Sequence, residues 1–510
     1  MIIGPYGIEY KKAGTSGSGD HPEAISPILS GTPELLRKTV NIYTSEDLES
    51  FHAFMMSDLH DFPRHFRHFR KLDLSFDIRH PSHAEMMVDI IDPASHLCML
   101  DIGYLDHLLD SNPRIPPALL RLSNLSVLLI DGLGANGIGF LKALKSPVLS
   151  LGVATDNSLP LEVSHLGSIA STLSFLAVTS NEFLFKPTDV IFPCVETLRL
   201  PTLICVPSTS IYHSFPNLKR LYLYSTSEPG FEQILADHEV NRAELARYNG
   251  PIPRLKTLVG DPFALFQSAL YCPVEKLLID PIDEARATLA LLPFARSCQP
   301  SILRLTLEYD EDDSEFAYLE QFSAELANVT ELKELWILVR FSHGFEEDSV
   351  SGGFIWELPE LLGKLPIQSL SVSFTFPHCR NAQMDDYDQF YEYFDLDLWV
   401  DEQVIKAFPT LRQLIVFTLA TCSQVRYVID TTEDEGREVV ETDYDFEGPW
   451  SFGHDYYVEE VPNEPICLFD PSLSTSRTTI LGIGPADGRL AASFFESVYS
   501  GLREGRVIRY

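Results

Sequence analysis

The chain has 510 residues, of which 45% are hydrophobic and 22% charged, a composition typical of globular proteins and unlike that of disordered ones. Its formal net charge is −35, so the chain as a whole should repel nucleic acid and anionic membrane surfaces. No uncharged apolar stretch is long enough to span a bilayer, so no membrane partner is expected.

The 8 cysteines indicate buried, reduced thiols and no disulfide framework. None forms a C-x-x-C pair, and several lie in apolar stretches, such as Cys205 in LICV. The opening residues lack the long apolar region of a secretory signal. We therefore expect a cytoplasmic or nuclear protein, in which residues 1–25 are disordered.

One motif, apolar-x-x-Leu-x-apolar, returns about a dozen times along the chain, mostly at intervals of about 19 to 30 residues, with a longer gap before Leu255 and wider gaps after Leu332. The stretch FPNLKRLYL at 215–223 shows it plainly. A single copy carries little information because leucine is common, but copies in tandem indicate a repeat architecture. The central leucines of the copies are Leu72, Leu100, Leu128, Leu151, Leu176, Leu198, Leu221, Leu258, Leu277, Leu305, Leu335, Leu370 and Leu414.

Each copy predicts one short strand, because its last two apolar residues are two apart and point to the same face. The segments between copies return the chain, and those at 135–146 and 314–329 have the amphipathic spacing of helices. Each unit leaves an apolar flank that only its neighbours can cover. We therefore expect an α/β solenoid over 26–420, with a curved parallel sheet on the concave face and helices and loops on the convex face. Residues 421–510 are predicted to form an acidic loop and a capping strand and helix.

The repeat length matches that of leucine-rich repeats. Together with the frequent FPxLxxLxL units and the opener SPILSGTPELLRKTVNIYT at 26–44, it resembles the fungal F-box/leucine-rich-repeat proteins. The resemblance implies that the repeats hold a protein substrate and that an N-terminal F-box binds a Skp1-type adaptor of a cullin ubiquitin ligase. Residues 21–36 lack a Leu-Pro-x-Glu pattern, so no adaptor-contact residue carries over.

The expected function is a non-enzymatic protein-binding module that recognises substrates for a ubiquitin ligase; a leucine-rich-repeat scaffold unconnected with ubiquitin is the alternative. The ligand should lie on the concave face, to which each strand presents one side chain between its two inward apolar residues. In the strand at 302–307 this residue is expected to be Thr306. Exposed aromatic and arginine side chains are typical binding anchors, so alanine at Tyr222 or Trp336 should weaken binding and leave the melting temperature nearly unchanged. The candidate partner-binding residues are Asp101, Arg199, Tyr222, Tyr224, Glu308 and Trp336.

A distant alternative is a nucleotide-dependent enzyme. The stretch LLIDGLGANGIGFLKAL places Gly132-x-Gly134-x-x-Gly137 between an apolar strand and a helical pattern, and Asp156 follows about 20 residues later, as in dinucleotide-binding folds. The other interpretation is that these glycines make a tight strand-to-helix turn within one repeat. No other cofactor is expected.

The stretch RHFRHFRK at 64–71 suggests a small anion-binding patch, or a strand entry in which Phe69 is buried and the arginines face solvent. His65 and His68 form an H-x-x-H pair without further ligands nearby, so no metal site is expected. The chain has no H-E-x-x-H, G-x-S-x-G or Walker A signature, and no catalytic residue is assigned.

Overall fold

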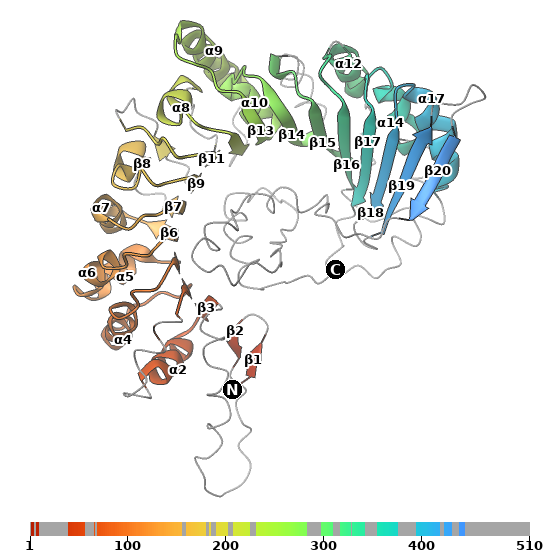
Figure 1. The fold of residues 1–510 in the computed structure, drawn as a ribbon. Helices are drawn as coiled ribbons and strands as arrows, with labels where there is room; N and C mark the ends of the chain where they lie inside the picture. The colour runs from red at the N-terminus through yellow and green to blue at the C-terminus, as the bar shows by residue number, and fades with distance from the viewer. Residues whose placement is uncertain are drawn as a thin grey trace, which may run out of the picture.

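In the computed structural model the chain is an α/β protein built on one long curved sheet (Figure 1). The structure describes residues 2–4, 7–9, 39–56, 66, 69–155, 160–179, 183–184, 190–201, 208–224, 231–282, 297–309, 317–327, 329–341, 354–375, 394–418, 423–430 and 438–443.

The main sheet, within these residues, has 16 strands that lie in their order along the chain. Its parallel strands are β3 (Thr39–Ile42), β4 (Lys71–Leu74), β5 (Met99–Ile102), β6 (Val127–Leu133), β7 (Ser150–Thr155), β9 (Phe175–Val178), β11 (Thr197–Pro201), β12 (Arg220–Tyr224), β13 (Leu255–Gly260), β14 (Val274–Ile282), β15 (Ile302–Tyr309), β16 (Glu334–Phe341), β17 (Ser369–Thr375) and β18 (Gln413–Thr418). The predicted parallel sheet is thereby confirmed.

Two further strands, β19 (Ser423–Asp430) and β20 (Glu438–Asp443), continue this sheet in antiparallel pairing. The acidic composition of 431–448 predicts a loop, yet Glu438–Asp443 is a strand. The two consecutive valines, β-branched residues that favour strands, account for the difference: Val439 pairs with Ile429 and Val440 with Val428. The capping strand and helix predicted nearer the C-terminus lie outside the described residues.

The motif leucines form one continuous row across the parallel strands. Leu72 pairs with Leu100, and Leu100 with Leu128. The row then continues through Leu151, Leu176, Leu198, Leu221, Leu258, Leu277, Leu303, Leu335, Leu370 and Leu414. All are at most 2% exposed and belong to one hydrophobic core. Burying a leucine stabilises the fold by about 1.5–3 kcal/mol, so this row is a main source of stability.

The register corrects the sequence prediction at β15. Leu303, and not Leu305, is the partner of Leu277 and Leu335. Leu303, Leu305 and Leu307 are all 0% exposed, so the alternation of β15 fits two frames that differ by two residues. A shift of two keeps every side chain on the same face but moves it along the strand. The concave neighbour of Trp336 is therefore Arg304, and not Thr306.

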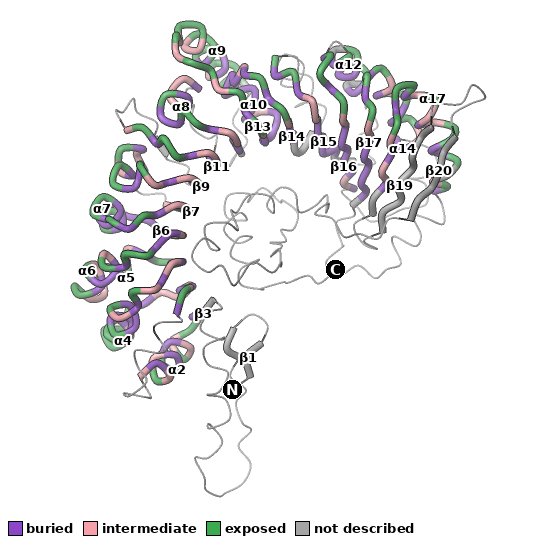
Figure 2. Tube along the Cα trace, viewed as in Figure 1, coloured by how far each residue is buried: buried purple, intermediate pink, exposed green. Residues whose placement is uncertain are grey.

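The helices lie on the convex side of the sheet (Figure 1). They include α7 (Ala135–Ala143) and α12 (Ala317–Leu326), which confirm the two helices expected from amphipathic spacing. The buried sides of the helices face the sheet and their exposed sides face outward (Figure 2). The other described helices are α2 (Ser45–Met56), α4 (Pro81–Ile91), α5 (Leu105–Ser111), α6 (Ile115–Leu120), η3 (Val163–Leu166), α8 (Ser208–Ser214), α9 (Phe231–Arg247), α10 (Pro262–Ser268), α14 (Phe354–Leu362), α16 (Leu396–Trp399), η4 (Val400–Val404) and α17 (Ile405–Ala407).

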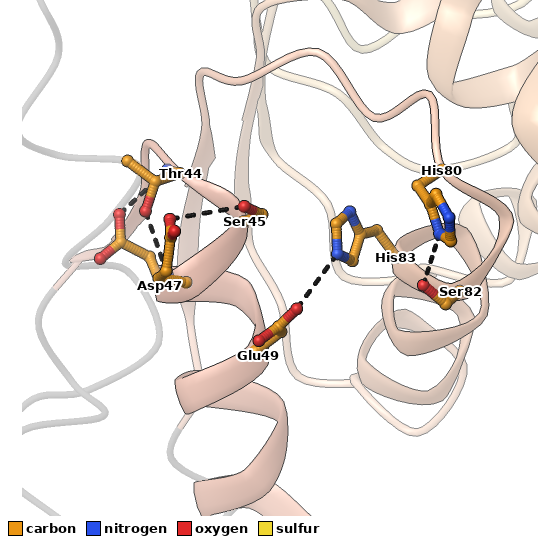
Figure 3. Close-up of polar contacts among 8 residues, drawn as sticks. Thr44, Ser45, Asp47, Glu49, His80, Ser82 and His83 are labelled. Carbon is orange, nitrogen blue, oxygen red and sulfur yellow. Dashed lines mark hydrogen bonds and ion pairs between the residues drawn. The ribbon is translucent and has the colours of Figure 1, made fainter.

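Helix α2 begins at a reciprocal cap (Figure 3). The backbone N–H of Asp47 donates to Thr44 Oγ1 at 3.2 Å, while the Thr44 N–H donates to Asp47 Oδ2 at 3.0 Å. This pair satisfies two backbone donors that a helix N-terminus leaves open. One turn along, Glu49 Oε1 lies 3.3 Å from Nε2 of His83 on α4, which links the first two convex helices.

Side chains also join successive units at the turns that lead into the strands. The amide of Asn124 donates to Ser95 O at 2.6 Å, and that of Asn217 to Pro193 O at 2.8 Å. The Ser126 hydroxyl donates to Cys98 O at 3.1 Å. The first two bonds satisfy turn carbonyls, whereas Cys98 O also accepts the backbone N–H groups of Ser126 and Val127, both at 2.9 Å.

Asp77 lies between two basic side chains near the N-terminal end of the array. Partial burial raises its pKa, but hydrogen bonds and charges from Arg79 and His107 outweigh this effect and hold the pKa below its usual value. His107 Nδ1 is 2.9 Å from Asp77 Oδ1. The contact ties the start of α5 to the turn after β4.

The remaining short strands lie outside the main sheet. Residues 1–25 are predicted to be disordered, but β1 (Ile2–Gly4) and β2 (Gly7–Glu9) pair antiparallel. β8 (Leu161–Glu162) pairs in parallel with β10 (Phe183–Leu184). Among the described residues no helix is both long and apolar enough to cross a bilayer.

Candidate functional site

The concave face of the sheet carries a row of side chains that alternate with the buried leucines. The pairing register places Asp73 beside Asp101, and Arg199 beside Tyr222. We call the central part of this row, on β11 to β16, the central strip. Its residues in order are Arg199, Tyr222, Val259, Leu278, Arg304 and Trp336.

The central strip is cationic and aromatic at both ends and apolar between them. Tyr222, Val259 and Leu278 form a hydrophobic cluster separate from the main core. The guanidinium carbon of Arg199 lies 4.4 Å from the centroid of the Tyr222 ring and 5.6 Å from that of Phe175 on β9. Such cation–π contacts hold the guanidinium in a fixed position and are worth about 0.5–2 kcal/mol each.

A second cation–π pair stands at the other end of the strip. Lys276 Nζ is 4.2 Å from the centroid of the Trp336 ring, although their strands, β14 and β16, are separated by β15. Lys276 therefore reaches across β15, near Arg304, which is the register partner of Trp336. Two cations and a large aromatic ring are thus concentrated at this place in a chain whose net charge is −35.

The N-terminal part of the same face carries two buried carboxyl groups. Asp73 and Asp101 are register partners and are only 1% and 0% exposed. The Ser75 hydroxyl donates to Asp73 Oδ1 at 2.5 Å. The face therefore carries buried carboxyl groups at one end and cations in its middle.

The predicted binding residues lie on this face, but they are not exposed as expected. Asp101, Arg199, Tyr222 and Trp336 occupy one row and are only 0%, 4%, 2% and 5% exposed. Arg199 packs on the rings of Phe175 and Tyr222, and Lys276 lies over the ring of Trp336, so these contacts cover part of each side chain. This burial argues against the expectation that alanine at Tyr222 or Trp336 leaves the melting temperature nearly unchanged, because each substitution would open a packed contact.

The other two predicted residues are placed only by their backbones. Tyr224 pairs with Pro201, and Glu308 pairs with Arg340. Their side chains lie outside the described part of the structure.

The sequence prediction missed Phe175, Lys276 and Arg304, which complete the two cation–π groups. Phe175 and Lys276 each lie two residues before the residue that was predicted to face outward in their strand. Because side chains two residues apart along a strand point to the same face, both lie on the concave face. The outward position two residues earlier in each strand is the sequence signal that identifies these two residues. Arg304 was missed because of the frame error at β15.

The glycine turn after β6 is filled by an aspartate of the preceding unit. Asp106 Oδ1 accepts the backbone N–H groups of Gly134 and Gly137, both at 2.8 Å, and Oδ2 accepts that of Asn136 at 3.0 Å. This carboxylate occupies the N-terminus of α7, where a dinucleotide pyrophosphate would bind. A phosphate there would meet a fixed negative charge, which argues against the nucleotide alternative.

The same contact explains the glycines. A Cβ at Gly134 would lie 2.5 Å from Asp106 Oδ2, and one at Gly137 would lie 2.4 Å from Leu133 Cδ1. Gly132 has a φ of 63°, in the left-handed region that favours glycine. The motif is therefore accounted for by close packing between two units. Asp156, the fourth residue of the fingerprint, lies outside the described residues.

The basic stretch at 64–71 follows the packing interpretation where it is described. Phe69 is buried in the core and Arg70 is exposed, while His65 and His68 lie outside the described residues. No group of three or more metal-ligating side chains occurs in the part of the chain that the structure describes.

The comparisons with known proteins assign no function to the chain, so its function has to be inferred from this geometry. No protein-family model and no curated protein matches the chain.

Proposed function

We propose that this chain is a non-enzymatic polypeptide-binding protein, a leucine-rich-repeat solenoid whose concave sheet face holds the ligand. The observation that carries the proposal is the central strip, with its two cation–π groups on a face where no described helix packs (Figure 1). The continuous leucine row supports the repeat assignment, because each unit offers the same buried face to the next.

The chemistry of the strip suits a polypeptide better than a small molecule. Tryptophan, tyrosine and arginine are the side chains that most often dominate protein interfaces. Those of the strip are held by neighbouring rings and cations, so little rotational freedom is lost when a ligand binds. The strip also crosses six strands, about 24 Å at the usual strand spacing, which is a length suited to an extended peptide.

A display selection tests this proposal. The folded full-length chain is immobilised and used to select peptides from a random library, and each selected peptide is then tested on two charge-reversal variants. Lys276→Glu changes the half-buried cation beside Trp336, whereas Lys142→Glu makes the same change on the exposed face of α7. We expect most selected peptides to lose at least about fivefold in affinity for the first variant and to keep their affinity for the second. Equal binding to both variants would remove the strip as the ligand site.

The ubiquitin-ligase setting is a second proposal, supported by the Phe-Pro units that carry the resemblance. Phe192 and Phe215 are both 0% exposed and stack at 5.1 Å between ring centroids, so the Phe-Pro signature is a repeated packing element. If the chain is a substrate receptor of this type, it should bind a purified Skp1-type adaptor. The absence of binding at micromolar concentrations would leave the alternative, a scaffold unconnected with ubiquitin.

A further inference from the structure

Helix α9, the longest helix of the described residues, is held firmly against α10 in the long interval before β13. The ring of His238 is buried and stacks on Phe266 at 4.0 Å between ring centroids, and its Nδ1 donates to Phe266 O at 2.7 Å. The buried amide of Asn241 donates to Gln267 O at 2.8 Å. These contacts fix the position of α9, so its outer side is a rigid surface.

The outer side of α9 gathers apolar side chains. Leu235 and Val240 are 38% and 52% exposed, and Ile252, just after the helix, is 43% exposed. Small exposed side chains accompany them on the helix, at Ala236, Ala243 and Ala246. Leu235, Val240 and Ile252 are three of the six large hydrophobic side chains that are exposed in the described part of the chain. Single exposed apolar residues are common, but their concentration in so short a stretch indicates a contact surface.

The exposed charges of α9 are divided between its two halves. Glu232 and Glu239 lie in the N-terminal half, and Arg242 and Arg247 lie in the C-terminal half. Two such helices repel each other when they are parallel and attract each other when they are antiparallel, because each acidic half then meets a basic half. The outer side of α9 is therefore complementary to itself across a twofold axis, the commonest symmetry of homodimers.

We propose that two copies of this chain associate through α9, with the two helices antiparallel. One row on the outer side of α9 follows the helical spacing i, i+4, i+7 and i+11, and its residues are Leu235, Glu239, Arg242 and Ala246. With the twofold axis beside the middle of this row, Glu239 of one copy faces Arg242 of the other, and Leu235 faces Ala246. Within one chain Arg242 Nη2 lies 2.9 Å from Glu239 Oε2, so pairing joins two ion pairs into a network of four charges.

The contact is small, so the dimer is expected to be weak and reversible. Helix α9 has 17 residues and is about 25 Å long, and a contact between two single helices is smaller than a stable interface of roughly 1,200–2,000 Å². The net charge of −35 opposes association, but charges more than about 8 Å from the contact are largely screened at physiological ionic strength. Because α9 lies on the convex side (Figure 1), pairing leaves both concave faces open, and the inference is independent of the proposed function.

Sedimentation equilibrium of the full-length chain at physiological ionic strength tests the pairing. We expect the average mass of the wild type to rise from that of a monomer towards that of a dimer between about 2 and 200 μM. The variants Glu239→Arg and Arg242→Glu each place like charges across the contact, so each should associate at least about tenfold more weakly. The control variant Glu85→Arg changes an exposed charge on α4 and should associate like the wild type.

Restoring the charge pattern tests the orientation. The double variant E239R/R242E exchanges the two charges, so opposite charges again meet across an antiparallel contact. An equal mixture of the two single variants should also associate, because every charge of one variant then meets its opposite on the other. We expect both samples to associate within about threefold of the wild type. A variant that had only lost its fold would not be rescued by mixing.

Three results would overturn the inference. The first is a wild type that stays monomeric at about 200 μM. The second is undiminished association of the two single variants, which would place the contact elsewhere. The third is the failure of both the double variant and the mixture to associate. None of these results bears on the concave face, whose ligand binding is tested separately by the selected peptides.

Discussion

Replacing Asp106 by alanine should destabilise the junction between two units far more than the same change at Asp110, one turn further along α5. Asp106 accepts three backbone hydrogen bonds at 2.8, 2.8 and 3.0 Å from the turn that starts α7. Asp110 accepts one bond, at 2.6 Å, from the exposed side chain of Asn136. The two substitutions remove the same charge from the same helix, so their difference isolates the backbone contacts.

The magnitude follows from these contacts. Loss of a capping side chain costs about 0.5–2 kcal/mol, and loss of a negative charge at a helix N-terminus costs a further 0.3–1 kcal/mol, approximately. Because Asp106 caps three donors, of which those of Gly134 and Gly137 are partly buried, we expect Asp106→Ala to cost about 3 kcal/mol. Asp110→Ala should cost less than about 0.5 kcal/mol, as is usual for exposed positions.

Urea unfolding followed by circular dichroism measures both free energies, and hydrogen exchange of the α7 amides shows where the loss occurs. Asp106→Ala should speed exchange in α7 before it affects β16 or β17, because each unit contacts only its neighbours. Equal stability of the two variants, or unchanged exchange in α7, would refute the assignment of the glycine turn to packing against Asp106.

Three more predictions concern the burial of the core, the reactivity of the thiols and the loss of stability at low pH. Leu335→Ala should lower the free energy of unfolding in urea by about 2–5 kcal/mol, because Leu335 is buried. Leu398→Ala, at a position that is 44% exposed, should lower it by under about 0.5 kcal/mol. Similar losses for the two variants would mean that Leu335 is not in the core. Burial raises the pKa of the Cys272 thiol to about 11. Iodoacetamide at pH 8 should therefore modify Cys272 at least about a hundredfold more slowly than the exposed Cys194, as followed by peptide mass spectrometry. Equal rates of modification would contradict this burial. The folded-state pKa of Asp77 is lowered, so its ion contacts stabilise the fold above about pH 4, and this part is lost as the pH falls through the folded pKa. Asp77→Asn should therefore reduce unfolding free energy at pH 6 and have little effect near pH 2, and a pH-independent difference would count against the ion contacts.

The long parallel sheet could be predicted from the sequence because it depends on a short-range pattern. The spacing of Leu198 from Leu200, and of Leu221 from Leu223, fixes which side chains share a face, and parallel pairing of successive units then fixes the row. The predicted register was wrong at β15, where the alternation of Leu303, Leu305 and Leu307 fits two frames. Only contact with neighbouring strands decides between them.

The properties of the site depend on contacts distant in sequence, and these were harder to predict. The burial of Arg199 and Trp336 depends on neighbours such as Phe175 and Lys276, which lie on other strands. The role of Gly134 depends on Asp106, 28 residues earlier. A pattern of residue types identifies the outward face of a strand, but the exposure of that face is a property of the assembled array.

The most direct test of the concave binding face is photo-cross-linking of a library-selected peptide that carries a benzophenone side chain. After irradiation with the full-length protein, mass spectrometry locates the cross-linked residues. The account predicts that they lie on the concave positions of β11 to β16, near Arg199, Tyr222, Lys276 and Trp336. Cross-links confined to the convex helices, such as α4, α7 and α9, would contradict it.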